Sequence, residues 1–236
     1  LTYRAAGPAR GTIGLIGKAI TFDTGGINLK PTGSVETMKI DMAGGAAVLA
    51  TLSALPALGL PITVHGVIAS AENMPSGGAF RPSDVLRTLS GKTVEIVSTD
   101  AEGRLVLADA LTYTARERPD AMIDLATLTG AAVVALGNQG TAVFGSDIPL
   151  VDDILAAAGT SGERMWATRL MPVAEKALCS ALAPLIVAAK SFASEPWTVE
   201  TLTPTFSNTR PFISPRVPPP VSPPLSPSTV ARCQGV

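Results

Sequence analysis

The sequence predicts an α/β fold in three layers (α/β/α), with helices on both faces of a mixed, mostly parallel sheet. Over the first 160 or so residues, short apolar runs typical of strands alternate with stretches of helical spacing. Polar and charged residues gather where several of these strands end. With 236 residues, 46% of them hydrophobic, the chain is long enough to bury a substantial core. Alternation of strands and helices is typical of layered domains with a largely parallel sheet.

The first half of the chain supplies two strands, a helix and a long loop. TIGLIG (12–17) is a short apolar run ended by glycine, which indicates a buried strand. The small residues of 42–55 have helical character, and we expect Pro56 to end that helix. The β-branched run 62–70 predicts a second strand, and the Gly- and Pro-rich stretch 75–84 predicts a loop.

The second half of the chain continues the alternation of strands and helices. We expect strands at 93–97, 121–126 and 132–137, and helices at 105–117 and 147–159. The first of these helices ends before Pro119, and the second has a glycine at its end.

The composition changes near residue 178. Nine of the twenty prolines lie between Pro204 and Pro227, and neither Asp nor Glu follows Glu200. We therefore divide the chain into an α/β domain at 1–178 and an atypical segment at 179–236, which we expect to be disordered from about residue 203.

Bulk properties exclude several classes of protein. The net charge is −1, without a Lys/Arg cluster, so nucleic acid is an unlikely partner. Cys179 and Cys233 form no disulfide framework or zinc motif. The apolar runs 125–137 and 181–189 are too short to span a bilayer, so we expect no membrane partner. The chain opens without Met or a signal-peptide pattern, which suggests a piece of a longer cytoplasmic protein.

Three polar clusters follow predicted strands, at the edge where open α/β sheets build their sites. The clusters are Lys18 with Asp23, Lys30 with Asp41, and Asp100 with Glu102 and Arg104. Four converging carboxylates would repel one another unless a cation neutralised them, and oxygen ligands without His or Cys suit divalent metals. A pair spaced like Asp100 and Glu102 can supply ligands to two metals, and Arg104 can hold a small anion beside them.

Simpler interpretations exist for each residue taken alone. Asp100 and Glu102 could cap the helix that begins near residue 103. Lys18 and Lys30 could be solvated surface lysines. His65, the only histidine, lies in an alternating strand and is interpreted as structural.

Several segments together resemble the leucyl aminopeptidase family, the cytosolic two-metal aminopeptidases of peptidase family M17. GKAITFDTGGINLKP (17–31), MKIDMAGGAA (38–47) and STDAEGRLVLADAL (98–111) are similar to its signature blocks. Segments 66–86 and 123–131 resemble further blocks in the same order, and the resemblance covers roughly residues 10–175. The chain departs from the family pattern at Ser98, where the family has Asn.

The resemblance implies a set of metal ligands. Asp23 and Glu102 would bridge two metals, Asp100 would complete the more labile site, and Lys18 and Asp41 would complete the tighter one. Lysine ligates a metal only as a neutral amine, so Lys18 would have to lose its proton on metal binding.

The resemblance also implies catalytic and pocket residues. Lys30 would polarise the scissile carbonyl, and Arg104 would hold a bicarbonate that acts as general base. The pocket for the first substrate residue would include Met38, Thr127, Leu128 and Gly130.

The function implied is hydrolysis of the N-terminal residue, preferably leucine-like, from peptides, through a water activated by two divalent metals. Mn²⁺ or Zn²⁺ is expected, with Mg²⁺ as a further possibility, and the family assembles as a homo-hexamer. Because few residues precede the first block and the family's later blocks are not found, we expect the family's N-terminal domain to be absent and the fold to be incomplete at both ends. Alternatives are therefore a weakly active or inactive truncated homologue, or a DNA-binding or scaffold role as in some relatives.

Overall fold

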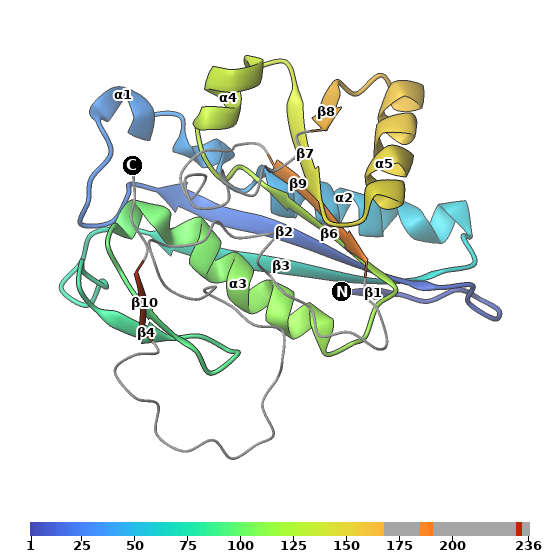
Figure 1. Cartoon of the computed structure of the whole chain (residues 1–236), viewed down its shortest axis with the longest axis horizontal. Helices are drawn as coiled ribbons and strands as arrows, with labels where there is room; N and C mark the ends of the chain where they lie inside the picture. The colour runs from blue at the N-terminus through green and yellow to red at the C-terminus, as the bar shows by residue number, and fades with distance from the viewer. Residues whose placement is uncertain (168–184, 191–229, 233–236) are drawn as a thin grey trace.

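The computed structural model of the chain describes residues 1–167, 185–190 and 230–232, with side chains described over 1–167. Its main body is a seven-stranded sheet (Figure 1). In spatial order the strands are β1 (Thr2–Tyr3), β3 (Thr63–Asn73), β2 (Thr12–Asp23), β6 (Ala121–Ala126), β9 (Leu185–Lys190), β7 (Thr141–Gly145) and β8 (Met165–Ala167). The β1–β3 and β6–β9 pairs are antiparallel and the other neighbours are parallel, which confirms the mixed, mostly parallel sheet.

A second, three-stranded sheet lies beside α3 (Glu102–Ala115), where the N–H of Leu89 donates to Asp109 Oδ1 at 2.8 Å. Its strands are β4 (Val85–Arg87), β5 (Thr93–Glu95) and β10 (Val230–Arg232). β10 falls within the tail for which the composition predicts disorder, and it pairs in parallel with β5. The rest of that tail, both cysteines and the proline-rich run lie outside the described residues.

The helical elements connect the strands. They are α1 (Thr32–Val35), the 3-10 turn η1 (Met38–Ile40), α2 (Ala43–Leu58), the 3-10 turn η2 (Thr99–Ala101), α3 (Glu102–Ala115), α4 (Ala131–Leu136) and α5 (Ile148–Ser161).

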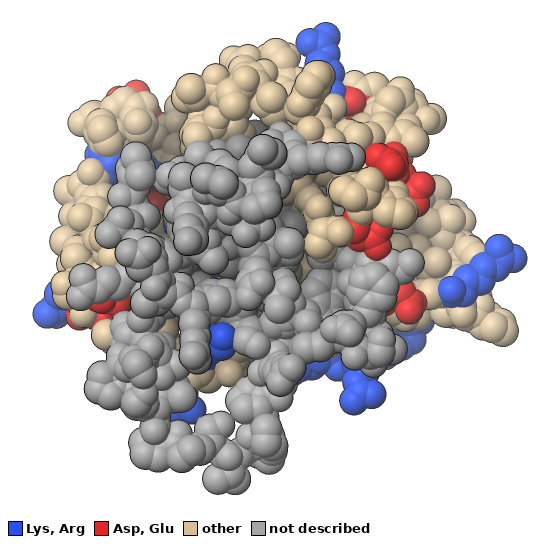
Figure 2. All heavy atoms as spheres, in the orientation of Figure 1, with Lys and Arg blue, Asp and Glu red and all other residues tan. Residues whose placement is uncertain are grey.

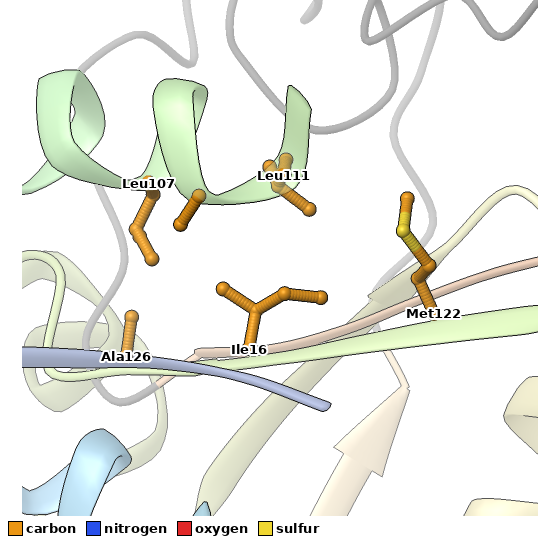
Figure 3. Packing of buried hydrophobic residues seen from close by; sticks show 6 residues of the cluster. Ile16, Leu107, Leu111, Met122 and Ala126 are labelled. Carbon is orange, nitrogen blue, oxygen red and sulfur yellow. The ribbon is translucent and has the colours of Figure 1, made fainter. Parts of the chain in front are cut away.

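Alternate residues of β2 face different helices, and this creates three layers. Ile16 packs with Leu107 and Leu111 of α3 on one face of the sheet, as Figure 3 shows. Ile13 and Leu15 pack on the opposite face, against the cluster that holds Val48, Leu52 and Leu55 of α2. Because successive strand side chains point to opposite faces, one apolar strand serves both layers. The predicted α/β/α arrangement is confirmed (Figure 1).

Small residues let α2 approach the sheet closely. A Cβ built on Gly44 would lie 2.0 Å from the carbonyl oxygen of Leu125, and one on Gly17 would lie 2.7 Å from Gly44. The helical stretch Thr32–Leu58 is long and apolar enough to cross a membrane by length and composition alone. In the described residues 28% of its apolar window is buried, and its α2 part packs against β2, β3 and β6.

Two element predictions are wrong. The run 132–137 is not a strand: Ala131–Leu136 forms α4, with Val134 88% exposed. A six-residue apolar run has no decisive periodicity, and the strand comes later, as β7. Pro56 does not end α2, which continues to Leu58 and is closed by Gly59 in the left-handed conformation. A proline in the last turn removes a single helical hydrogen bond, which the helix tolerates.

The remaining strand and helix predictions are correct in type, and all except β6, which matches residue for residue, differ from the structure in their ends. The largest difference is β2, which continues six residues past the predicted strand, to Asp23. Helix α3 begins at Glu102 and not at residue 105, so the acids of the STDAEGRL segment lie at its start.

Candidate metal centre

The candidate site lies where β2 and β3 end and α3 begins. Lys18 and Asp23 come from β2, Glu102 is the first residue of α3, and Asp100 lies in η2 just before it. Asp41 follows η1, and Lys30 lies in the loop that follows β2. The fold thus brings together every lysine and carboxylate that the sequence predicted for the site.

Lys18 is the buried centre of one half of the site. Its side chain is 2% exposed, and its Nζ lies 2.8 Å from Asp41 Oδ1 and 3.0 Å from Glu102 Oε1. Nζ also donates to the backbone carbonyl of Thr127 at 3.0 Å. The three hydrogens of the ammonium group therefore have three oxygen partners.

Gly103 makes room for Lys18. A Cβ at this position would lie 2.8 Å from Lys18 Cε and 2.9 Å from its Nζ. The glycine between Glu102 and Arg104 therefore serves the close approach of Lys18 to the start of α3.

Lys30 completes the other half. Its Nζ lies 3.0 Å from Asp23 Oδ2 and 2.6 Å from Asp100 Oδ1. Asp23 is buried, whereas the side chain of Asp100 is 37% exposed, so this half faces the surface.

The carboxylates are close enough to share a cation. One ligand oxygen from each of Asp23, Asp100 and Glu102 lies within 4.8 Å of the others. With all groups ionised, four carboxylates and the two lysines leave a formal charge of −2 (−4 + 2). A mostly buried site with this excess charge attracts cations, and its oxygen-rich donor set suits hard divalent ions.

The pKa values of the lysines and carboxylates reflect burial and the charges of their neighbours in the site. Burial lowers the pKa of Lys18, but Glu102 and Asp41 raise it by more, so it lies above the ordinary value. Burial raises the pKa of Glu102 and of Asp41, and Lys18 opposes that rise. Burial lowers the pKa of Lys30, but hydrogen bonds to Asp100 and Asp23 raise it by more, leaving it above its ordinary value. The cluster holds its positive charges tightly because it carries excess negative charge.

One atom of the site is left without a partner among the described residues. Asp41 Oδ2 is buried and accepts no hydrogen bond, although Oδ1 accepts from both Lys18 and Thr127. A buried carboxylate oxygen without a donor is costly, and a bound cation would satisfy it. The residues present therefore fit a divalent metal.

Sequence reasoning missed two buried residues of the site. Asn73, the last residue of β3, donates to Asp23 Oδ1 at 2.8 Å, to the carbonyl of Thr99 at 3.0 Å and to Glu102 Oε2 at 3.3 Å. Thr99 Oγ1 donates to the carbonyl of Gly25 at 2.6 Å and accepts from the N–H of Asn28 at 2.9 Å. A polar side chain at the carboxyl end of β3 was the available signal for Asn73.

The four predicted pocket residues differ in how closely they approach the site. Thr127 touches the site through Lys18 and Asp41, and Leu128 lies against the start of α3, near Gly103. Met38 is half-buried, and its carbonyl accepts from the N–H of Asp41 at 3.3 Å. Gly130 is exposed at the start of α4, and a Cβ built there would meet nothing within 4 Å.

Arg104 and Ser98 flank the acids. Arg104 is half-buried in the first turn of α3. It follows Glu102 by two positions at the start of that helix. Ser98 caps η2 by accepting from the N–H of Asp100 at 3.3 Å, which holds the turn without supplying a metal ligand.

The fold and the site define an α/β/α domain with a carboxylate-rich cluster at the carboxyl edge of its sheet, whose residues fit a divalent metal. The chain belongs to the cytosol aminopeptidase family: the sequence model of that family's catalytic domain matches residues 1–198. This confirms the resemblance found in the sequence.

The individual relatives are similar over most of this chain. It is 54% identical over 166 residues to a probable cytosol aminopeptidase of Geobacter sp. (strain M21), covering 70% of this chain and 34% of that protein. It is 46% identical over 185 residues to one of Syntrophotalea carbinolica, covering 78% and 37%. The chain thus spans about a third of the length of these curated relatives.

A solved structure shares the fold. The bottromycin maturation enzyme BotP in complex with Mn is 38% identical, with a TM-score of 0.70, and the match covers 89% of this chain and 50% of BotP.

Proposed function

We propose that this chain carries the catalytic centre of a metal-dependent aminopeptidase, which removes the N-terminal residue, leucine-like by preference, from peptides. The observation that supports it is the cluster of four carboxylates and two lysines, found in a chain of the cytosol aminopeptidase family. The relatives' names favour a soluble protein, and we propose a cytoplasmic location.

Two divalent ions would be held by Asp23 and Glu102 together, with Asp100 on the surface side and Lys18 and Asp41 on the buried side. Such ions supply Lewis acidity and an acidified water to peptide hydrolysis. Mn²⁺ is a suitable choice because the similar BotP structure is a complex with Mn. Zn²⁺ and Mg²⁺ are the other candidates.

Lys30 is suited to stabilising charge and not to accepting a proton. Its raised pKa keeps the ammonium protonated at neutral pH. From the surface side of the site it can stabilise negative charge that develops on the scissile carbonyl oxygen. We propose that Arg104, at the start of the same helix as Glu102, holds a bicarbonate that accepts a proton from the attacking water.

The need for a free N-terminus would follow from the metals. A free α-amine in its neutral form could bind one divalent ion through its nitrogen, whereas an acylated nitrogen has no basic lone pair to offer. The half-buried Met38, Thr127 and Leu128 would contact the first substrate side chain.

The test is hydrolysis of leucine p-nitroanilide by the purified full chain with Mn²⁺ or Zn²⁺, or with EDTA. N-acetyl-leucine p-nitroanilide tests the need for a free amine. Glu102→Gln should abolish hydrolysis, while Glu117→Gln, the same change at an exposed position after α3, should not. Metal-independent hydrolysis, or equal cleavage of the acetylated substrate, would refute the proposal. Mn²⁺ binding without hydrolysis would identify a non-catalytic homologue instead.

A further inference from the structure

Asn73 connects three parts of the site through one amide nitrogen. It lies level with Asp23 in the parallel β2–β3 pair, so the two side chains leave the same end of the sheet on the same face. Its Nδ2 has oxygen acceptors on β2 (Asp23), η2 (Thr99) and α3 (Glu102). Asn73 is itself 4% exposed, so water does not compete for these contacts.

The three acceptors fix which end of the amide faces the carboxylates. An amide nitrogen carries two hydrogens, and an amide oxygen can only accept. Turning the group over would place its oxygen against three other oxygens. With three acceptors for two hydrogens, the 3.3 Å contact to Glu102 shares a hydrogen with a shorter one.

Each carboxylate gives one oxygen to Asn73 and presents the other to a lysine. Asp23 Oδ1 accepts from Asn73 and from the N–H of Gly25, while Oδ2 faces Lys30. Glu102 Oε2 accepts from Asn73, while Oε1 faces Lys18. The amide therefore fixes the orientation of both carboxylate groups. Because it is neutral, it does so without changing the negative charge of the site.

We propose that Asn73 is a positioning residue of the metal centre, which holds Asp23 and Glu102 at the angle from which both bind cations. This inference rests on the proposed function, because these two carboxylates are the ones assigned to bridge the metals. Groups that orient metal ligands in this way change metal affinity or activity by about 10–100-fold when removed.

The test is calorimetric titration of Mn²⁺ into the full chain and two variants. Asn73→Leu keeps the number and branching of the side-chain heavy atoms and donates nothing, and Asn73→Ala removes the amide. Both should weaken Mn²⁺ binding about 10–100-fold. Thr114→Val is the matched control: Thr114 is fully buried and its hydroxyl bonds only within α3, to the carbonyl of Ala110, so its loss lowers stability and leaves Mn²⁺ affinity unchanged.

The outcomes separate the two proposals. If the unmodified chain binds no Mn²⁺, the metal-dependent function fails and this inference fails with it. If that chain binds and the Asn73→Leu variant binds equally well, only the positioning role is refuted.

A measurement on the unmodified chain covers the case in which neither variant folds. The side-chain amide signals of Asn73, followed by NMR as Zn²⁺ is added, should shift, while those of the exposed Asn138 should not. Asn73 signals that stay unmoved at saturating Zn²⁺ would refute the role.

Discussion

Lys18 and Asp23 reach the same face of the sheet although they are five positions apart on one strand. In a regular strand an odd separation places two side chains on opposite faces. The β2–β3 register shifts between Ile20 and Phe22, so β2 contains one extra residue, Thr21. On the partner strand, Ala69 and Asn73, which pair with Lys18 and Asp23, are four residues apart and share a face. The β-bulge thus assembles the site.

Deletion of Thr21 should leave the metal centre in place. Without the extra residue, Lys18 and Asp23 are four positions apart, an even separation that places both side chains on one face of a regular strand. Mn²⁺ affinity measured by calorimetry should therefore change by less than about tenfold, below the loss expected for an orienting group. Thr21→Val keeps the bulge at an exposed position and should also bind normally. Loss of Mn²⁺ binding by a folded deletion variant would show that the local geometry of the bulge, and not only the face it sets, positions Asp23.

Gly103→Ala should weaken metal binding through Lys18. The new Cβ would lie 2.8 Å from Lys18 Cε, and three oxygens hold the ammonium in place, so Lys18 must move away from Asp41 and Glu102. A loss of about tenfold in Mn²⁺ affinity is expected. Gly159→Ala, in α5 with nothing within 4 Å, should instead raise the free energy of unfolding by up to about 1 kcal/mol. Equal metal affinity in the two variants would contradict this account.

Gly44→Ala should destabilise the domain. Its Cβ would lie 2.0 Å from the backbone carbonyl oxygen of Leu125, which cannot rotate away, so α2 must move off the sheet. The expected cost is about 1–3 kcal/mol or more. Urea unfolding followed by circular dichroism measures it, with Gly33→Ala in open space as control. A Gly44→Ala midpoint equal to that of the control would mean that the close contact is not needed.

Asp124 should make stability fall as the pH rises from 4 to 8. Burial raises its pKa to about 8, with Lys18 opposing the rise. Between these values the unfolded chain is ionised and the folded chain keeps the proton. The free energy of unfolding therefore loses about 1.4 kcal/mol per pH unit through this group, and the loss stops above pH 8.

Asp124→Asn removes this titration. With EDTA present to exclude metal effects, the variant should match the unmodified protein near pH 4 and be more stable at pH 8. Urea midpoints across this range provide the measurement. Asp153→Asn, at an exposed position of α5, should reproduce the unmodified curve. Parallel curves for Asp124→Asn and the unmodified protein would show that Asp124 does not carry the proton.

Local patterns were reliable where both periodicity and flanking residues agreed. The strand at 121–126 matches β6 residue for residue, and the helix at 147–159 differs from α5 by one or two residues at each end. The short run 132–137 had no such support. It forms α4 because Val134 N–H bonds to the carbonyl of Gly130, and Gly137 ends the turn. Nothing local distinguishes that outcome from a strand.

The sequence by itself determined the layered α/β class, the family, and the identities of the lysines and carboxylates of the site, because these depend on residue type, spacing and order along the chain. Only the tertiary structure decided how they meet. The bulge at Thr21 turns Asp23 toward Lys18, and Asn73 arrives from a strand fifty residues away to face both Asp23 and Glu102. Those relationships depend on strand register and on contacts between distant segments, which local sequence patterns do not encode.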